Sequence, residues 1–390
     1  MVTTQATPVR ISASVTEIDP SEWKRLFPFL VRGYSFFRTL EETLTNQFKF
    51  YYLSFYEDSK ITGIAPCFIM DYSLETTVEG PLKRVAVWIR KRVPRFLTLR
   101  VLICGSPLGT GALGFDRASP PEVSEPLVTS MSALARKEKA SLLAFKDFSE
   151  SYDLFLKPIL KRGFHRIPGF PSVELDLNFK SFEEYFASLS RATRKDLKRK
   201  FKKVDGESNL RMEVRTELGE WLDRVYELYL NTFEKSEVRF EKITRSFLER
   251  IAKNMPEETR YFLWFLGEQL VAFDLCLVSG DLLIDEYVGM DYEVARRYPL
   301  YFLTFRDIYH WCLEHGIRRY ESSALNYEPK KRLDFHFISQ YLYVKYLNPV
   351  GNLAFGLLCR FLKPENFDPV LKSLKEREKQ LSNEKASASA

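Results

Sequence analysis

The chain has 390 residues, 45% of them apolar and 15% aromatic, which is too long for one small domain and enough for large cores. Its net charge of +6 is a mild bias toward anionic partners. Five widely spaced cysteines, with no C-x-x-C pair and no His cluster, exclude a typical structural zinc site and predict free, buried thiols. The N-terminus lacks the apolar core of a signal peptide, and no apolar run approaches the ~20 residues of a membrane span. We therefore expect a cytoplasmic protein of two domains without a metal.

The first half alternates helices and strands after a polar N-terminus, residues 1–13, that we expect to be disordered. An Asp-Pro-Ser start signal opens the first helix. The predicted helices are 19–30, 36–44, 122–140 and 151–165, and the predicted strands are 50–58, 60–73, 97–104, 141–149 and 170–177.

Two segments of this half suggest ligands. Residues 85–100 interleave aromatic and basic side chains, which suits a membrane surface or nucleic acid as well as a solvated loop. Residues 104–114, CGSPLGTGALG, are rich in glycine. They lack the Gly-Lys-Ser/Thr ending of a P-loop, so they are a candidate ligand loop only because glycine allows close backbone approach.

The most charged stretch is Arg191–Lys203, which follows a short predicted helix with a Ser181 cap. Six cations fall at helical spacing and share one face, opposite Leu197 and Phe201: Arg191, Arg194, Lys195, Lys198, Arg199 and Lys202. This stripe can neutralise a tRNA backbone or a nucleotide-linked substrate. It is equally typical of a solvated helix face.

Residues 259–324 read as three strands, a helix and a fourth strand. The strands 259–266, 269–278 and 282–289 precede a helix that starts after Pro299 and ends at Gly316, and a strand at 317–324 follows it. A strand, a crossover helix and a strand fit a right-handed βαβ unit.

The hairpin of this unit carries three carboxylates, Asp274, Asp285 and Glu286. If Ser279 and Gly280 form the turn, Asp274 lies opposite Asp285; one more loop residue places it opposite Glu286. Like charges directly opposite are destabilising. A buried pair raises the pKa of one member, which makes a proton acceptor at neutral pH, whereas an exposed pair is merely screened.

The start of the predicted helix at Pro299 is a candidate anion site. Backbone N–H groups in a first helical turn lack internal partners, and two cations, Arg296 and Arg297, precede them. A phosphate-bearing ligand and an ordinary basic loop both fit this pattern.

The run from Gly267 to Lys330, with its hairpin, helix and strand, resembles the acetyltransferase fold of the GNAT superfamily, in its FemAB-like and BioF2-like branch around peptidoglycan biosynthesis. The resemblance implies an α/β (α+β) fold of two tandem GNAT-like domains, each a mixed, mostly antiparallel sheet flanked by helices. The expected division is 14–177 and 178–350, followed by a C-terminal helix and disordered tail at 351–390.

The resemblance also implies site residues. Asp274, Asp285 or Glu286 would accept the amine proton, and Tyr287 or Tyr327 would protonate the leaving group. Arg239 and Phe240 would contact the acceptor, and Asn326 with Lys330 or Lys331 matches a family position near the reacting carbonyl. The residues expected to hold the donor phosphate are Arg296, Arg297, Tyr298, Leu300 and Tyr301. The glycines of the usual phosphate loop are missing from this stretch.

Three functions follow from these expectations. The first is an N-acyltransferase, such as an N-acetyltransferase, that uses an acyl-CoA and a primary amine. The second is an aminoacyl-tRNA-dependent transferase acting on a cell-wall or peptide amine, which the stripe and the missing glycines favour. The third is a non-catalytic GNAT-like scaffold that binds an anionic polymer or a membrane.

Overall fold

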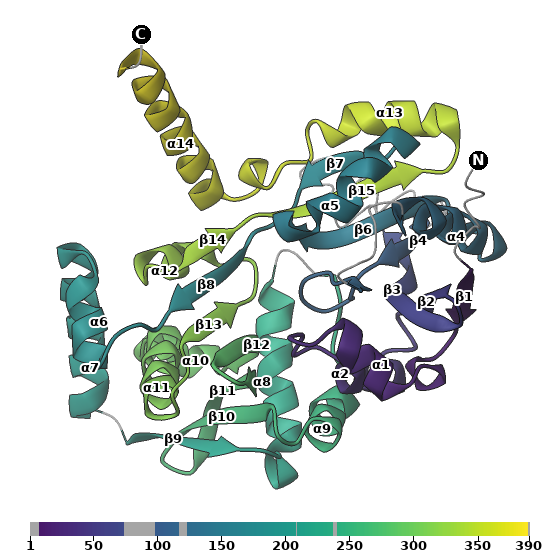
Figure 1. The fold of residues 1–390 in the computed structure, drawn as a ribbon. Helices are drawn as coiled ribbons and strands as arrows, with labels where there is room; N and C mark the ends of the chain where they lie inside the picture. Colours follow the sequence, from purple (N-terminus) through teal and green to yellow (C-terminus); the bar gives the residue numbers. More distant parts are fainter. Residues whose placement is uncertain (1–7, 74–97, 117–122, 208, 237–239, 389–390) are drawn as a thin grey trace, which may run out of the picture.

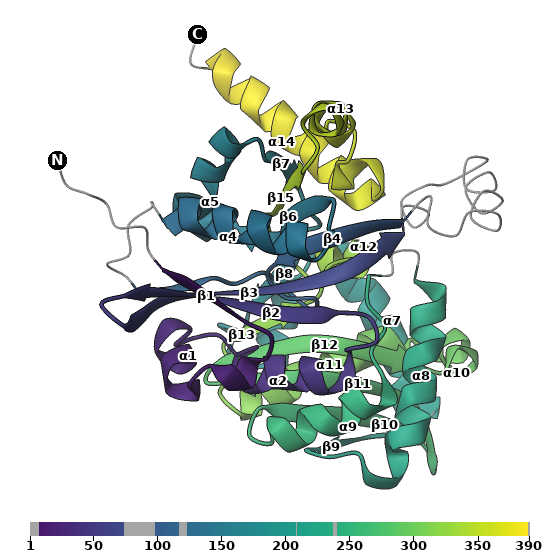
Figure 2. The same cartoon turned by 90° about the vertical axis from the view of Figure 1, so that its right-hand side faces the viewer.

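In a computed structural model, the described part of the chain comprises residues 8–73, 98–116, 123–207, 209–236 and 240–388. Two mixed β-sheets face each other, and helices fill the space between them and cover their outer faces (Figures 1 and 2). Most of the basic and aromatic stretch predicted at 85–100, and the predicted acceptor contact Arg239, fall outside the described residues.

The first sheet has the order β1-β2-β3-β4-β6-β15-β7, with β5 paired to β3. Among the described strands of this sheet, only β4 and β6 pair in parallel. Its strands are β1 (Val9–Ser12), β2 (Lys49–Glu57), β3 (Lys60–Ser73), β4 (Thr98–Cys104), β5 (Gly114–Phe115), β6 (Leu142–Ser149), β7 (His165–Pro168) and β15 (Gln340–Tyr346). Strand β1 lies within the segment expected to be disordered, because its backbone completes the edge of the sheet beside β2.

The second sheet has the order β14-β8-β13-β12-β11-β10-β9, and within its described residues only β12 and β13 pair in parallel. Its strands are β8 (Ser172–Asp176), β9 (Leu210–Arg215), β10 (Thr259–Leu266), β11 (Gln269–Ser279), β12 (Leu282–Met290), β13 (Arg319–Ser322) and β14 (His336–Ile338). The four strands predicted between 259 and 324 are β10 to β13, and the predicted helix between them is α11 (Leu300–Glu314).

A two-stranded ribbon joins the two sheets. Strands β7 and β8 follow each other in the chain, as do β14 and β15, yet β7 and β15 pair in the first sheet while β8 and β14 pair in the second. Each half of the chain thus contributes a strand to the other half's sheet. The division expected at residue 177 therefore does not separate the two sheets.

Helices divide the core into three layers. Helices α1 (Pro20–Leu26), α2 (Tyr34–Thr43), α8 (Leu222–Lys235) and α9 (Arg245–Asn254) lie between the sheets and share one apolar cluster with both of them. The outer face of the second sheet packs on α6 (Phe182–Ser188), α7 (Arg191–Glu207), α11 and α12 (Tyr327–Arg332). The outer face of the first packs on α4 (Ser124–Lys137) and α5 (Asp153–Leu156). Because the middle cluster contains residues from both halves, the two domains share a core.

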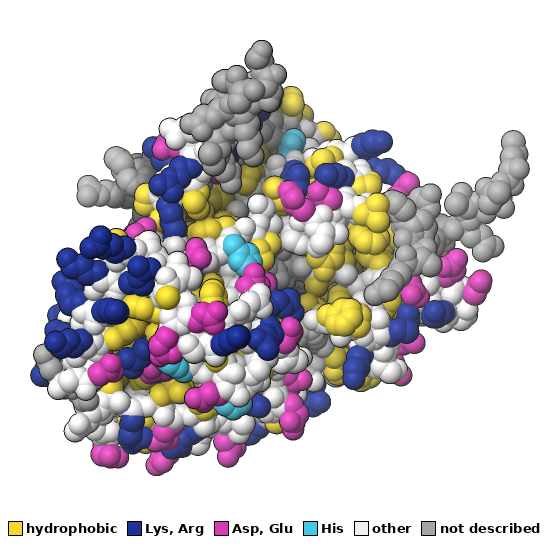
Figure 3. Space-filling model, turned by 60° about the vertical axis from the view of Figure 1, so that its left-hand side comes forward, with side chains coloured by type: hydrophobic (Ala, Val, Ile, Leu, Met, Phe, Trp, Pro, Cys, Tyr) yellow, Lys and Arg dark blue, Asp and Glu magenta, His cyan; other side chains and the backbone are white. Residues whose placement is uncertain are grey.

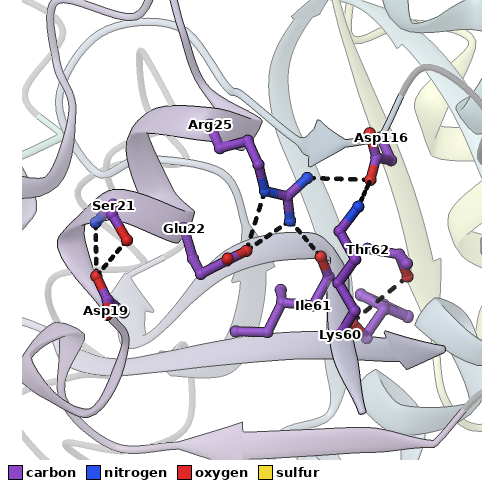
Figure 4. Close-up of polar contacts among 9 residues, drawn as sticks. Asp19, Ser21, Glu22, Arg25, Lys60, Ile61, Thr62 and Asp116 are labelled. Carbon is purple, nitrogen blue, oxygen red and sulfur yellow. Dashed lines mark hydrogen bonds and ion pairs between the residues drawn. The ribbon is translucent and has the colours of Figure 1, made fainter. Parts of the chain in front are cut away.

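The predicted start of α1 is confirmed in atomic detail. Asp19 caps the helix by accepting hydrogen bonds from the backbone N–H and the hydroxyl of Ser21, both at 2.7 Å. From the last turn of α1, Arg25 donates to the Ile61 carbonyl and pairs with Asp116 at 3.0 Å (Figure 4). These contacts fix α1 on the edge of the first sheet.

Three other expectations were wrong. The segment at 151–165 is not one helix, because after α5 it continues as a 3-10 helix (Lys157–Arg162) at Pro158. The polar loop expected at 290–298 contains helix α10 (Tyr292–Arg297), capped by the Asp291 carboxylate. The C-terminal segment contains α13 (Pro349–Cys359) and α14 (Pro369–Ala388), and α14 continues to Ala388, where a disordered tail was expected.

Candidate active site

A β-bulge on β12 sets the positions of the three predicted carboxylates. Cys276 pairs with Asp285 and Leu275 pairs with Tyr287, so Glu286 is an extra residue between two ladder positions. The expected register was wrong: Asp274 lies opposite Val288, because the turn is Gly280-Asp281 rather than Ser279-Gly280. Gly280 has φ +59°, which favours glycine there.

The bulge nevertheless brings Asp274 and Asp285 together on the face that packs against α11. The two carboxyl groups are hydrogen-bonded to each other, and Asp274 is almost fully buried. Asp285 Oδ2 also accepts hydrogen bonds from the Tyr320 hydroxyl at 3.2 Å and the Ser322 hydroxyl at 3.0 Å. Burial, and then the charge of Asp285, raise the pKa of Asp274 well above its ordinary value. Burial and the neighbouring charge therefore favour the protonated form of Asp274.

A small cavity of about 20 Å³ lies beside this pair. It has room for one water molecule and is too small for an amine substrate. Its polar lining comes from five elements, β11, β12, α11, β13 and α12, and comprises Asp274, Asp285, Tyr301, Thr304, Tyr320, Ser322 and Lys330. A larger hollow of about 450 Å³ at the other end of the sheet, between Arg215, Trp311 and His315, has no carboxylate in its lining.

Lys330 of α12 lines the same cavity as the two aspartates. Its ammonium donates to the Ser323 carbonyl at 2.5 Å and the Leu325 carbonyl at 3.1 Å. Burial lowers the pKa of Lys330 to about 8, although the two aspartates oppose that shift. It thereby fixes a strained loop in which Leu325 and Asn326 both have positive φ, 74° and 50°.

Of the two candidate lysines, only Lys330 reaches the cavity. Lys331 points elsewhere and donates to the Ser373 hydroxyl of α14 at 3.2 Å. Asn326 is hydrogen-bonded to Tyr301, so two more predicted residues meet beside the cavity.

Glu286 points away from the aspartate pair, toward the first domain. Its carboxylate accepts a hydrogen bond from Arg32 Nε at 2.7 Å, and Arg32 also reaches Glu321 at 3.3 Å. Burial raises the pKa of Glu286, even though the Arg32 charge opposes that shift. Glu286 is therefore a tie between domains in this structure, and Arg32 is a partner that no local sequence signal could have indicated.

The two predicted tyrosines lie apart from the cavity. The Tyr287 hydroxyl donates to Glu241 Oε1 at 2.9 Å, and burial raises the pKa of Glu241. The Tyr327 hydroxyl donates to the Pro171 carbonyl at 2.8 Å. Both hydroxyl protons already have acceptors in this conformation.

Phe240 packs at the domain junction rather than in an open acceptor channel. Its ring lies 6.4 Å from the ring of Phe48 in the first domain, and the Lys146 ammonium lies 5.0 Å from its centre. Glu241 beside it is a buried carboxylate that sequence patterns did not single out, since it lies in an irregular segment.

At the predicted phosphate site, several backbone N–H groups already have acceptors within the chain. The N–H groups of Leu300, Phe302 and Leu303 already donate to the carbonyls of Tyr298 and Pro299, at 2.8 to 3.1 Å. The side chains of Tyr298 and Leu300 are buried. Arg296 is exposed and paired with Glu293 at 3.1 Å, while Arg297 is exposed. Three backbone N–H groups in the first turn of α11 therefore already have acceptors within the chain.

The glycine-rich loop at 104–114 is explained by close packing. A side chain at Gly111 would come within 2.4 Å of the Lys146 carbonyl, and one at Gly109 within 2.6 Å of the Arg32 guanidinium. The glycines let the loop lie against β6 and Arg32.

No three His, Cys, Asp or Glu side chains gather as metal ligands within the described residues, where all five cysteines are buried, free thiols.

Comparisons with known proteins find similarity in the second half of the chain and in the fold. Residues 191–331 match the model of the acetyltransferase (GNAT) domain. A proposed 8-amino-7-oxononanoate synthase 2 of Mycobacterium tuberculosis is 26% identical over 320 residues, covering 77% of this chain and 40% of that protein. The chain thus spans well under half the length of this curated relative.

Two solved structures share the two-domain fold. FemX aligns with a TM-score of 0.53 at 12% identity, covering 83% of this chain and 93% of that one. A tandem GNAT protein from the clavulanic acid biosynthesis pathway aligns with a TM-score of 0.52 at 11% identity, covering 88% and 99%. The match to the GNAT domain model thus includes the bulged strand β12 and the Asp274–Asp285 pair, and the two solved structures share the fold of this chain.

Proposed function

We propose that the protein transfers an acyl group from an activated carrier to a primary amine, with the Asp274–Asp285 pair as the proton acceptor. The observation that carries this proposal is the buried, hydrogen-bonded carboxyl pair beside a cavity for one water molecule. A carboxyl with a raised pKa is matched to taking up a proton near neutral pH.

In the proposed reaction the amine nitrogen attacks the carbonyl carbon, and the bond from that carbon to the sulfur or oxygen of the carrier breaks. The proton lost by the amine passes through a water in the cavity to the carboxyl pair, because the cavity is too small for the amine itself. Lys330 donates two N–H groups to the loop carbonyls and lines the cavity, so its positive charge favours negative charge that develops nearby on the reacting oxygen.

The donor that we favour is an aminoacyl-tRNA. Two observations support it: three N–H groups at the start of α11 already have acceptors within the chain, and α7 presents a row of exposed cations. Figure 3 shows Lys and Arg side chains gathered on the flank where α7 lies. Acyl-CoA is the second candidate, since GNAT folds generally use it. The acceptor expected from the family resemblance is an amine of a cell-wall precursor or peptide.

The test compares both donors with one set of variants. Thermal unfolding with acetyl-CoA, longer acyl-CoAs and free CoA checks for binding, since ligand at ~100 times its Kd adds about 2.7 kcal/mol of stability. Transfer of a radiolabelled amino acid from a charged tRNA pool to amino-acid and peptide amines checks for the other donor.

The double variant Asp274→Asn with Asp285→Asn should abolish transfer from either donor. Asp281→Asn, on the turn of the same hairpin and exposed, is the matched control and should keep wild-type activity. Transfer that survives the double variant would contradict the proposed proton acceptor. Donor binding without transfer, unchanged in the double variant, would favour the scaffold function instead.

A further inference from the structure

Helix α13 has its apolar face turned outward. Its exposed large side chains lie between 51% and 80% exposed and follow helical spacing: Val350, Leu353, Leu357 and Leu358, with Phe361 continuing the row just past the helix end. A helix packed on a protein body normally buries its apolar stripe and exposes its polar one. Here α13 lies at the edge of the molecule, over β7 and β15 (Figure 1).

The inner face of α13 contacts the rest of the protein through small and polar groups. Asn352 donates to the Gly163 carbonyl at 2.9 Å and accepts from the Tyr346 N–H at 2.9 Å. A side chain at Gly356 would come within 2.5 Å of the His165 ring. These contacts anchor the helix in a fixed orientation, so its apolar face is held outward by specific interactions.

Positive charge borders both ends of this face. The segment 349–363 contains Arg360 and Lys363 and no acidic residue. At the other end, Lys345 lies against Gly163, beside Arg162 and Arg136. Burial lowers the pKa of Lys345, and the charges of Arg162 and Arg136 lower it further, so an anion at this place would relieve their repulsion.

We infer that α13 lies in the plane of a membrane surface and binds anionic phospholipids, with its apolar row among the acyl chains and its flanking cations at the phosphates. A helix that lies in a membrane surface needs exposed apolar side chains bordered by Lys and Arg, and it needs a fixed orientation on the protein. Helix α13 has all of these features. No described helix is long and apolar enough to span a membrane, so this contact is with one leaflet. The inference does not depend on the proposed reaction.

The experiment is flotation of the full chain with vesicles of phosphatidylcholine alone and of phosphatidylcholine with phosphatidylglycerol. The wild type should float with the anionic vesicles and at least about tenfold less with the neutral ones. Leu353→Gln with Leu357→Gln should reduce flotation by about tenfold or more while leaving thermal unfolding unchanged, because both side chains are exposed.

Two controls separate the apolar and the charged contributions. Phe29→Gln removes a large exposed side chain on the loop after α1 and should float like the wild type. Arg360→Gln with Lys363→Gln should weaken binding to anionic vesicles only. The inference is overturned if the wild type does not float, if it floats equally with neutral vesicles, or if the leucine variant floats unchanged. Light scattering that shows a dimer, converted to monomer by the leucine variant, would also overturn it, by making this face a contact between two copies.

Discussion

The Arg32 guanidinium of the first domain lies 2.7 Å from the Glu286 carboxylate of the second, and the two residues are 254 positions apart in sequence. Their side chains are only 8% and 7% exposed. Glu286 is the bulged residue of β12, so the feature that brings Asp285 to its partner Asp274 also sends the next carboxylate across the domain junction. One backbone irregularity thus builds both the candidate site and a tie between the domains.

Arg32→Met should destabilise the protein by about 3–5 kcal/mol, because it leaves the buried Glu286 and the partly exposed Glu321 without their counter-charge. Urea unfolding followed by circular dichroism measures the loss. Arg10→Met, which breaks an exposed ion pair with Glu17, is the matched control and should change stability by less than about 1 kcal/mol.

Adding Glu286→Gln to Arg32→Met should recover part of that loss, since the buried charge left behind is removed as well. A double variant as unstable as the sum of the two single variants would show that Arg32 acts through packing against Gly109 and not through its charge.

Asp274→Asn should make stability less dependent on pH. The pKa of Asp274 is raised in the folded state, so the folded protein keeps a proton that the unfolded chain releases above its ordinary pKa of 3.8. The contribution of Asp274 to the stability of the wild type is therefore fully present below that value, and it is lost as the pH rises through the folded pKa. Its slope from this group is at most about 1.4 kcal/mol per pH unit.

Urea unfolding of both proteins at several pH values between about 4 and 8 measures the difference. Glu241 and Glu286 shift in the same direction in both proteins and cancel in the comparison. A wild-type-to-variant difference that stays constant with pH would mean that Asp274 is ionised in the folded protein.

The order of elements in the second half could be predicted because each strand and helix has a local signal: apolar runs, the glycine at 280, and the Pro299 and Gly316 boundaries of α11. The strand register could not be predicted, because the pattern of apolar residues does not reveal a bulge, and the bulge shifts every pairing beyond it. The prediction still named Asp274 and Asp285 together, because both face the same side of the hairpin.

Contacts between distant segments account for the remaining misses. Arg32 lies on a loop with no motif, and its two partners are fixed only when the sheets face each other. The ribbon of β7, β8, β14 and β15 joins strands from both halves, and no local propensity distinguishes an exchanged strand from one that stays in its own sheet. At the start of α11, the carbonyls of Tyr298 and Pro299 accept hydrogen bonds from three backbone N–H groups. The sequence gives no sign of these bonds beyond the absence of the usual glycines.

Lys330→Met should loosen the loop at Ser323–Asn326 and lower activity, because its ammonium holds two loop carbonyls beside the cavity. Hydrogen exchange of the amides in 323–326 should accelerate, and transfer should fall by roughly a hundredfold if Lys330 also stabilises the reacting oxygen. Lys331→Met is the control on the same helix and should leave both measurements near the wild type. Equal effects from the two variants would assign the change to α12 as a whole.

The exposed row on α7 predicts salt-dependent binding to tRNA. Lys195, Lys198 and Lys202 are exposed, and no ion pair joins them to a carboxylate in the part of the chain described here. Each phosphate contact contributes about −0.7 to −0.9 to the slope of log affinity against log salt, so replacing all three with Gln should make that slope shallower by about 2–3.

The matched control replaces three exposed cations on α1, α2 and α9 with Gln, at Lys24, Arg38 and Lys253, which gives the same change in net charge on another side of the molecule (Figure 1). They should lower affinity much less, because they do not form one row. A slope that both variants reduce equally would reflect net charge alone, and it would remove the main support for aminoacyl-tRNA as the donor.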